Sequence, residues 1–408
     1  MEFKLKSIHI QNFKSLKDTK IELADFNVLV GVNGSGKSNI VEVFRFLRHI
    51  NQQGMINPFL RCGGYKNLVW KGNEELPMTF KLNFEDENKE VLSYELVISG
   101  FRDVFKLERE SIISNDFKII NNGKNVILEY SGQKIESDKL KDMKIKNELL
   151  ENKVLFSSSI GILMPLILGA SMDLNEKERD TFMNVMPTIL RNSIINSTHN
   201  FIPANMKSPA KFESSERFQF VVLFPKLTNQ LDYDGSNLQM FLYGLFSENK
   251  GEWPKEIINR LKILFPNIES MKPIPTPEGR VVLEVVENGI RFIPQSISDG
   301  FFKIMAVLAL SFEKSEINLL VIDELENSIH PEAIEILIDA LKNSGKQVII
   351  TTHSPIVLNV CELEDILFVK KDVDETKVSR VKNAEKLKKD LENTGISVGE
   401  GWLYGALE

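Results

Sequence analysis

Gly31-Val32-Asn33-Gly34-Ser35-Gly36-Lys37-Ser38 is the stretch of sequence from which the rest of this chain can be interpreted. It matches the pattern G-x-x-x-x-G-K-[ST] in full. The apolar run Phe26 to Val30 before it indicates a buried strand, and apolar residues recurring on one face predict a helix from Lys37 to about Ile50. A Gly-rich turn between a strand and a helix lets backbone N–H groups surround phosphate groups at the helix N-terminus. The stretch therefore predicts a phosphate-binding loop.

The side chains of this loop have distinct expected roles. Lys37 is expected to reach the terminal phosphates of a nucleotide, and the hydroxyl of Ser38 is expected to bind Mg²⁺. The remaining phosphate-contacting residues are expected to be Asn33, Gly34, Ser35, Gly36 and Asn39. The cofactors that this loop predicts are ATP and Mg²⁺.

Two carboxylates follow a second apolar run. Leu319 to Ile322 is typical of a buried strand, and Asp323 and Glu324 come directly after it. Asp323 is the expected Mg²⁺ ligand, and Glu324 is the expected catalytic residue that polarises the attacking water. Without the phosphate-binding loop, an acidic turn after a core strand would be the simpler interpretation.

Two further segments could contact a phosphate. His353 follows a strand predicted from Gln347 to Thr351, and we expect it to face the crevice of Asp323 and to hydrogen-bond the γ-phosphate as a catalytic residue. A lone histidine is more often structural, so this role depends on its neighbours. Ser298 and Gly300 precede a helix predicted to run from Gly300 to Phe312, and this helix start suits phosphate contact and a plain helix cap equally.

The composition limits the class of protein. The 408 residues are 42% hydrophobic and 26% charged, which is ordinary for a globular chain of two or three lobes, and a net charge of -7 excludes a generally basic nucleic-acid surface. Cys62 and Cys361 form no C-x-x-C pair, which indicates two reduced thiols. The most apolar stretch, Ile160 to Ala170, is shorter than the roughly 18 residues of a membrane span. We therefore expect it to be a buried helix in a cytoplasmic protein without membrane contact.

The pattern along the chain predicts three regions in an α/β fold. Residues 1–135 would form an N-terminal lobe with the phosphate-binding loop and an antiparallel β region between Met78 and Tyr130. Residues 136–289 would be a mainly helical insert that also holds strands at Phe218–Phe224 and Val281–Val286. Residues 290–408 would form a C-terminal lobe, with a helix from Pro331 to Lys342 and a strand around Ile366 to Val369.

The motifs occur in a characteristic order, together with several flanking stretches. These are Ile10-Gln11-Asn12-Phe13-Lys14-Ser15-Leu16, Asn33 to Asn39, Asp323-Glu324-Leu325-Glu326-Asn327, Ile329-His330-Pro331, Thr352-His353-Ser354-Pro355 and Gly399-Glu400-Gly401-Trp402-Leu403-Tyr404-Gly405-Ala406-Leu407. In residues 1–50 and 290–370 the chain resembles the ABC-type ATPase heads of the SMC, RecF and OLD group. Its tail is similar to that of compact, stand-alone members, many of which are prokaryotic defence ATPases coupled to a separate effector.

The resemblance implies an ABC-type P-loop ATPase head with a mixed sheet, an antiparallel β lobe and a helical insert. It also implies a head-to-tail homodimer, or a higher oligomer, in which Ser298 and Gly300 contact the γ-phosphate of the opposite protomer's ATP. Glu326 and Asn327 fall where this group has its D-loop. Two features depart from the group: the signature is Ser-Asp-Gly-Phe-Phe-Lys at 298–303, and Gln52 and Gln53 are candidates for the Q-loop glutamine only by composition.

The resemblance favours a Mg²⁺-dependent ATPase, converting ATP and water to ADP and phosphate, that acts as a switch. It would control a partner effector encoded nearby, in anti-phage defence. The alternative is a RecF-like DNA repair or recombination ATPase that binds DNA directly, and a transporter subunit is disfavoured by the altered signature. The opening Gln11-Asn12-Phe13-Lys14-Ser15-Leu16 disfavours the transporter as well.

Two other features bear on nucleic acid. Lysines cluster at 139–146 and at 382–389, and both clusters suit either a solvated helix face or contacts with DNA phosphates. Asp372-x-Asp374 resembles a nuclease metal motif, but only residues 375–408 follow it, so we expect no nuclease domain.

Overall fold

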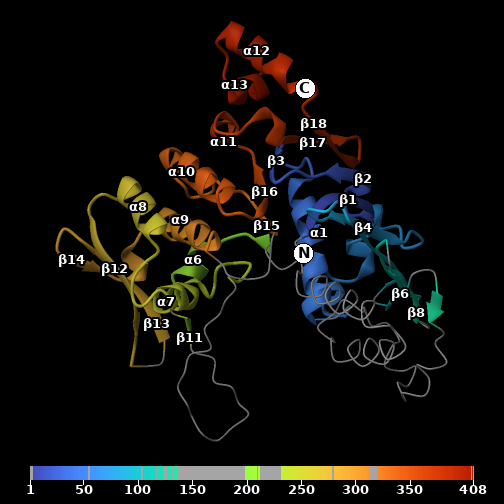
Figure 1. The fold of residues 1–408 in the computed structure, drawn as a ribbon, viewed down its shortest axis with the longest axis horizontal. Coiled ribbons are helices and arrows are strands. Elements are labelled where there is room, and N and C mark those ends of the chain that lie inside the picture. Colours follow the sequence, from blue (N-terminus) through green and yellow to red (C-terminus); the bar gives the residue numbers. More distant parts are fainter. Residues whose placement is uncertain are drawn as a thin grey trace, which may run out of the picture. The chain divides into compact units, whose positions relative to one another are not determined.

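The computed structural model describes residues 3–53, 56–102, 104–115, 117–122, 126–130, 133–135, 198–208, 210–211, 231–277, 280–312, 319–405 and 407. The chain divides into two compact units, each built from segments that are distant in sequence (Figure 1). Unit 1 comprises Met1–Asn196, Glu316–Leu319 and Leu367–Lys382. Unit 2 comprises Ser197–Ser315, Leu320–Ile366 and Asn383–Glu408.

An eight-stranded sheet in the order β2-β1-β4-β5-β6-β7-β8-β9 forms much of unit 1, and every neighbouring pair is antiparallel. Its strands alternate buried and exposed residues, as expected for a sheet with one face against a core. The antiparallel β region predicted between Met78 and Tyr130 is thus confirmed. The strands are β1 (Lys4–Phe13), β2 (Leu16–Glu22), β4 (Met78–Glu85), β5 (Val91–Phe101), β6 (Val104–Ile113), β7 (Phe117–Asn121), β8 (Val126–Tyr130) and β9 (Gln133–Ile135).

An aromatic cluster joins helix α1 (Lys37–Gln53) to this sheet. The ring of Phe46 lies 5.5 Å from that of Phe13 on β1 and 5.6 Å from that of Phe80 on β4, measured between centroids. Phe59 on α2 (Ile56–Arg61) meets Phe46 edge-on at 5.2 Å. Buried rings in tilted and edge-to-face contact add to the hydrophobic term, so they hold α1 firmly on the sheet. Two 3₁₀ turns follow, η1 (Tyr65–Asn67) and η2 (Trp70–Gly72).

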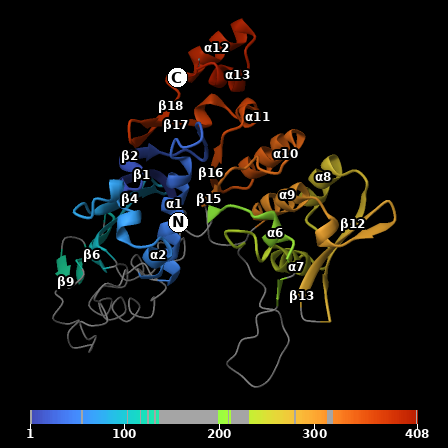
Figure 2. The same ribbon diagram turned by 180° about the vertical axis from the view of Figure 1, so that it is seen from behind.

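Three strands close to the phosphate-binding loop complete unit 1. All five residues of β3 (Phe26–Val30) are buried, as its continuous apolar sequence predicts. The strand order continues from β3 to β17 (Ile366–Asp372) and then to β18 (Glu375–Arg380), which forms an antiparallel hairpin with β17. The hairpin brings residues from near the chain's end beside its first strands (Figure 2).

The motif-bearing strands of unit 2 lie in the order β10-β15-β16. β15 (Leu319–Ile322) and β16 (Gln347–Thr352) are entirely buried, and β10 (Thr198–His199) pairs parallel to β15. The helices that follow or precede these strands are α6 (Pro203–Met206), α9 (Asp299–Leu310), α10 (Pro331–Lys342) and α11 (Pro355–Asn359). Buried residues occupy the whole circumference of α9 from Phe301 to Leu310, so this helix is enclosed by protein.

The predicted insert is mixed where it is described. Helices α7 (Leu238–Glu248) and α8 (Lys255–Leu264) accompany a small sheet in the order β11-β13-β12, with β14 paired to β13. Its strands are β11 (Ala210–Lys211), β12 (Ile268–Pro275), β13 (Arg280–Glu287) and β14 (Ile290–Phe292). The strand expected at Val281–Val286 is confirmed as part of β13. A 3₁₀ turn, η4 (Pro294–Ser296), leads to α9.

The C-terminal segment adds η5 (Leu363–Asp365), α12 (Ala384–Thr394) and α13 (Val398–Leu403). A capping box begins α13, in which Ser397 and Glu400 satisfy each other's backbone N–H groups. Gly399 of α13 lies against α11 so closely that an added Cβ would be 2.3 Å from the carbonyl oxygen of Pro355. The two helices therefore pack with almost no space between their backbones.

Several predictions fall outside the described residues. They are the buried helix at Ile160–Ala170, the strand at Phe218–Phe224 and the lysine cluster at 139–146. Across the described part of the chain, no helix has the length and apolarity needed to cross a bilayer.

Candidate functional site

The phosphate-binding loop of unit 1 has the left-handed backbone conformation that its glycines allow. Gly34 and Gly36 have φ angles of 79° and 111°, in the left-handed region that favours glycine. Lys37 is buried, and its Nζ donates hydrogen bonds to the carbonyl oxygens of Gly31 at 2.6 Å and Val32 at 3.2 Å. The ammonium group therefore lies across the loop, where an incoming phosphate could exchange for these carbonyls. Ser38, the second residue of α1, is exposed.

Two glycines of the loop are required by close neighbours. An added Cβ at Gly31 would be 2.2 Å from the carbonyl oxygen of Val369 on β17. An added Cβ at Gly36 would be 2.0 Å from Thr376 Oγ1 on β18. Both contacts come from the hairpin of β17 and β18 in unit 1. The sequence pattern of the loop does not predict them. The hairpin of β17 and β18 thus limits the space around the loop.

Thr376 holds the loop from behind through a buried hydrogen-bond network. Its Oγ1 donates to the carbonyl oxygen of Ser35 at 3.0 Å and lies 2.7 Å from Ser15 Oγ, and its backbone N–H donates to the Ser15 carbonyl at 2.8 Å. Asn39 Nδ2 in turn donates to Ser15 Oγ at 2.6 Å. Ser15 and Asn39 both belong to motif stretches noted in the sequence, whereas Thr376 gave no sequence signal. It is a positioning residue for the loop.

In unit 2, Asp323 lies at the end of β15 and is held by two donors. Thr351 Oγ1 of β16 donates to Asp323 Oδ1 at 2.6 Å, and Asn200 Nδ2, just beyond β10, donates to Oδ2 at 3.4 Å. The side chain is 7% exposed, so it is a desolvated carboxylate at the ends of three neighbouring strands. Sequence reasoning missed Asn200, because a two-residue strand leaves no recognisable pattern.

Glu324 occupies a strained turn that re-aims its side chain. Its φ of 49° is unusual for a residue with a Cβ and indicates a conformation maintained by its surroundings. Its N–H donates to Thr351 Oγ1 at 2.8 Å, its carbonyl accepts from Lys303 Nζ at 2.7 Å, and its Oε2 accepts from Asn327 Nδ2. The hydroxyl of Thr351 thus binds Asp323 and the Glu324 backbone at once.

Lys303 is the buried cation of this cluster. It belongs to the signature segment on α9, is only 2% exposed, and hydrogen-bonds the Glu324 carbonyl. Burial lowers the pKa of Lys303 to about 8, although the carboxylates of Glu326, Glu324 and Asp323 oppose this shift. The departure from the group's signature sequence therefore places a titratable amine beside the predicted catalytic glutamate.

His353 follows β16 and is 42% exposed at its side chain. Its Nδ1 lies 3.2 Å from Glu326 Oε1, and its backbone N–H donates to the same oxygen at 2.8 Å. Asp323, Glu324, Asn327 and His353 are thus gathered at one end of the β15–β16 pair, as the sequence predicts for the carboxyl ends of neighbouring strands.

Ser298 and Gly300 lie at the start of α9. Ser298 is its N-cap, since its Oγ accepts from the N–H of Phe301 at 3.2 Å. An added Cβ at Gly300 would be 2.6 Å from the carbonyl oxygen of Ser328, which follows Glu324 and Asn327 in the same turn. Asp299 pairs with Lys207 at 2.6 Å. The plain cap is therefore present, and Gly300 also allows the signature helix to touch the turn after β15.

The candidates for the Q-loop glutamine, Gln52 and Gln53, belong to the last turn of α1. At a rise of 1.5 Å per residue, the backbone there lies more than about 20 Å along the helix from Lys37. An amide that reaches the Asp323 carboxylate is that of Asn200.

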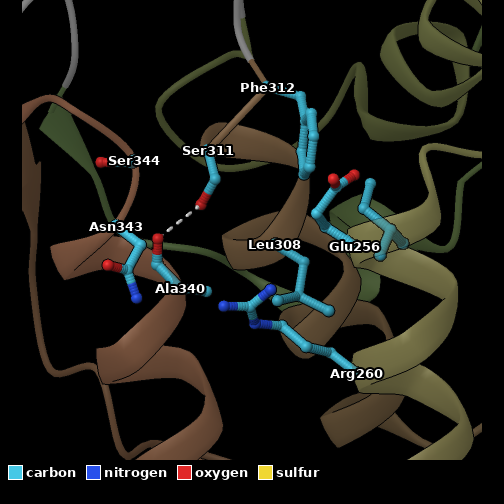
Figure 3. Close-up of a pocket in the computed structure, with 9 residues that line it drawn as sticks. Glu256, Arg260, Leu308, Ser311, Phe312, Ala340, Asn343 and Ser344 are labelled. Atoms are coloured by element: carbon cyan, nitrogen blue, oxygen red, sulfur yellow. Dashed lines mark hydrogen bonds between the residues drawn. The ribbon is translucent and has the colours of Figure 1, made fainter.

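A hollow of about 360 Å³ in unit 2 contains none of the predicted site residues (Figure 3). It lies at the C-terminal ends of α9 and α10, beside α8, whereas Ser298 and Gly300 lie at the opposite end of α9. The Ser311 hydroxyl donates to the Ala340 carbonyl at its rim. Its lining residues are Glu256, Ile257, Arg260, Leu308, Ser311, Phe312, Ala340, Asn343 and Ser344.

A family comparison covers the loop, the carboxylates after β15 and the histidine after β16 together. The family described as RecF/RecN/SMC N terminal domain matches residues 4–377. The chain belongs to this family. The family resemblance and the α/β fold class expected from the sequence are therefore confirmed.

Individual relatives are similar over different extents. The chromosome partition protein Smc of Methanococcus voltae is 46% identical over 44 residues, which cover 10% of this chain and 4% of that protein. The SMC head domain from Thermotoga maritima is 15% identical, with a TM-score of 0.43 over 94% of this chain and 100% of that one.

A second solved head domain has similar coverage. The Smc head domain with an extended coiled coil bound to the C-terminal domain of ScpA, derived from Pyrococcus furiosus, is 14% identical to this chain. Its TM-score is 0.49 over 96% of this chain and 99% of that one. At these scores the structural likenesses add nothing to the family assignment, which rests on the family match.

The hydrogen bond from Thr376 Oγ1 to the Ser35 carbonyl predicts the effect of Thr376→Val. Valine keeps the shape but leaves the Ser35 carbonyl without its buried donor, so the free energy of unfolding should fall by about 1–3 kcal/mol. Urea denaturation followed by circular dichroism would measure it. Thr79→Val, at a half-buried position on β4, is the control and should change stability by less than about 0.5 kcal/mol. Equal effects of the two substitutions would contradict the stabilising role of the Thr376 hydroxyl.

The lowered pKa of Lys303 predicts a pH dependence of stability. Between about pH 8 and the ordinary lysine value of 10.5 the unfolded chain binds this proton and the folded chain does not. The contribution of Lys303 to the free energy of unfolding is therefore smallest below pH 8 and rises up to pH 10.5. Urea midpoints measured across this range should rise less steeply in Lys303→Met than in the wild type. Parallel slopes would show that the amine titrates normally.

Proposed function

We propose that this chain is a Mg²⁺-dependent ATPase switch that dimerises head-to-tail around ATP. The observation that carries the proposal is the loop at residues 31–38, whose glycine conformations and buried Lys37 suit the binding of a triphosphate. Its family membership supports the same function. On this proposal, the loop of unit 1 would bind the phosphate chain, and the carboxylates of unit 2 would take part in hydrolysis.

The loop residues fit a phosphate chain. Ser35 Oγ is buried and has no hydrogen-bond partner among the described residues, so a donor remains free inside the loop. Lys37 would exchange its two loop carbonyls for phosphate oxygens, and N–H groups at the start of α1 would bind them too. Asn33, Gly34, Gly36 and Asn39 complete the proposed phosphate contacts.

The carboxylate cluster fits a magnesium site that depends on the nucleotide. No group of three or more histidine, cysteine, aspartate or glutamate side chains in the described ranges is arranged to hold a metal on its own. Mg²⁺ characteristically binds through one or two protein oxygens together with phosphates and water. Asp323 and Ser38 are the proposed protein ligands, and bound Mg²⁺ would neutralise charge on the phosphates.

Glu324 and His353 are the proposed catalytic residues. Glu324 would orient and polarise the attacking water, and its turn holds it in place through Thr351 and Lys303. His353 would hydrogen-bond the γ-phosphate. Ser298 and Gly300 would contact the γ-phosphate of the nucleotide on the opposite protomer, so ATP would stabilise the dimer.

A dimer that forms with ATP and separates after hydrolysis can control a partner. A swing from 1:99 to 99:1 needs about 5.5 kcal/mol of differential binding between the two states, which several phosphate contacts per site can supply. We propose that a protein effector encoded nearby reads this state, in anti-phage defence. Capture of partners from the native host with and without ATP, identified by mass spectrometry, tests this part of the proposal.

The alternative is a RecF-like ATPase that binds DNA directly. Four exposed lysines lie in α12 or just before it: Lys382, Lys386, Lys388 and Lys389. Acidic residues are interspersed among them, and Lys388 lies 3.8 Å from Glu362. This mixture is typical of a solvated helix. Tight DNA binding that weakens steeply with salt would favour the alternative.

Lys37→Ala should weaken ATP binding by about 10–100-fold, since charged hydrogen bonds to phosphate contribute about 1.5–3 kcal/mol. Isothermal titration calorimetry with Mg-ATP would measure the affinity. Lys20→Ala, at an exposed lysine paired with Glu22 on the same unit, is the control and should bind normally. Unchanged ATP affinity in Lys37→Ala would refute the assigned role of the loop.

Glu324→Gln should slow hydrolysis by about 10²–10⁴-fold while ATP binding is retained, because the amide cannot accept a proton from water. The variant should also accumulate as a dimer with ATP, which size-exclusion chromatography with light scattering would detect. Glu385→Gln, on the exposed side of α12, is the control. Normal turnover in Glu324→Gln would mean that another group activates the water.

A further inference from the structure

Glu326 is a buried carboxylate that none of the proposed catalytic steps uses. It follows β15 by four residues, and its side chain is 9% exposed. Its Oε1 accepts hydrogen bonds from Thr352 Oγ1 at 2.9 Å and from the backbone N–H of His353 at 2.8 Å, and lies 3.2 Å from His353 Nδ1. One carboxylate oxygen thus contacts three polar groups at the C-terminal end of β16.

These contacts determine which ring nitrogen of His353 carries hydrogen. The 3.2 Å separation of Nδ1 and Oε1 is an ion-pair contact, and because a carboxylate oxygen repels a nitrogen lone pair, it favours the form of the ring that carries hydrogen on Nδ1. Nε2 is then the nitrogen left for a ligand, on a ring that is 42% exposed. A phosphate oxygen only accepts hydrogen bonds, so Nε2 would have to carry a hydrogen of its own to contact one.

The pair is rigid on the carboxylate side. The bonds from Thr352 and from the His353 backbone tie Glu326 to the strand that carries the ring. Its other oxygen, Oε2, is buried and accepts no hydrogen bond from any residue in the described ranges. Oε1, the oxygen held by these bonds, is therefore the one that faces the imidazole, and the Lys303 ammonium also interacts electrostatically with this carboxylate.

A second pair in the same unit shows the contrast. His330 and Glu332 approach only to 3.8 Å, and their side chains are 75% and 86% exposed. Such a pair is solvated and does not orient either ring nitrogen. Burial, three contacts and shared attachment to β16 distinguish the Glu326–His353 pair from it.

We propose that Glu326 is a positioning residue for His353: it holds the Nδ1–H form of the ring and directs Nε2 to the terminal phosphate of the nucleotide. The assignment rests on the proposed ATPase function. It predicts that the carboxylate matters only through His353, and that an isosteric amide preserves part of its effect because it can still accept the Nδ1–H bond.

The first test reads the ring directly and needs no ATPase activity. The chain has 5 histidines, so ring-¹⁵N-labelled protein gives few signals, and His353→Ala identifies the one of interest. We expect Nδ1–H in the wild type and in Glu326→Gln, and loss of this form in Glu326→Ala. Glu332→Gln should leave the His353 signal unchanged. A wild-type ring with hydrogen on Nε2 and none on Nδ1 would overturn the proposal.

The second test measures steady-state Mg-ATP hydrolysis. Glu326→Ala should lower kcat by about tenfold or more, in the range of one lost acid–base contact, with KM changed by less than about threefold. Glu326→Gln should retain more activity than Glu326→Ala, and the double variant Glu326→Ala/His353→Ala should be no slower than His353→Ala. A wild-type kcat in Glu326→Ala, no recovery in Glu326→Gln, or additive effects in the double variant would each overturn the proposal.

The two tests separate failure of this proposal from failure of the proposed function. A wild-type chain that hydrolyses no ATP would refute the ATPase assignment and, with it, the phosphate target of Nε2. A hydrolysing wild type with an unaffected Glu326→Ala variant would refute the role of Glu326 alone.

Discussion

The hydroxyl of Thr351 is the contact that joins Asp323 and Glu324 within the carboxylate cluster. It donates to the Asp323 carboxylate and accepts from the backbone N–H of Glu324, so one buried oxygen binds the side chain of one residue and the backbone of the next. Glu324 can maintain a left-handed φ of 49° because this bond and the Lys303 bond hold its peptide on both sides. A hydroxyl at this place in β16 satisfies the turn without adding charge beside two carboxylates. The order of the site thus comes from the neighbouring strand.

Unit 1 uses the same chemistry behind the loop at residues 31–38. Thr376 of β18 places its hydroxyl behind the phosphate loop, where it supports the Ser35 carbonyl and occupies the space that a side chain at Gly36 would need. In both units a buried threonine from a neighbouring strand supports residues that the motif itself names. Loops with exposed backbone groups are commonly supported in this way, because their own hydrogen bonds cannot fix them.

Sequence reasoning identified the elements with strong local patterns. β3, β15 and α10 have the predicted boundaries, because continuous apolar runs and a proline at the first helical turn are local signals. It missed β10, β18 and α13, whose sequences are short or mixed and which acquire their structure from packing partners distant in the chain.

The candidate site divides in the same way. Motif patterns named Lys37, Asp323, Glu324 and His353, since phosphate and metal chemistry restricts residue type and spacing. The residues that hold them are Asn200, Lys303, Thr351 and Thr376, and each acts through a contact far away in sequence. No periodicity or motif encodes such contacts, so only the folded chain reveals them.

The absence of a side chain at Gly399 has a mechanical consequence. Because its backbone touches that of Pro355 directly, no compressible layer of side chains separates α13 from α11. α11 begins immediately after His353, with Ser354 as its cap. The histidine segment is therefore coupled by direct backbone contact to α13, where Leu403 and Tyr404 lie at the surface. The C-terminal helix α13 is thus packed against the helix that His353 precedes.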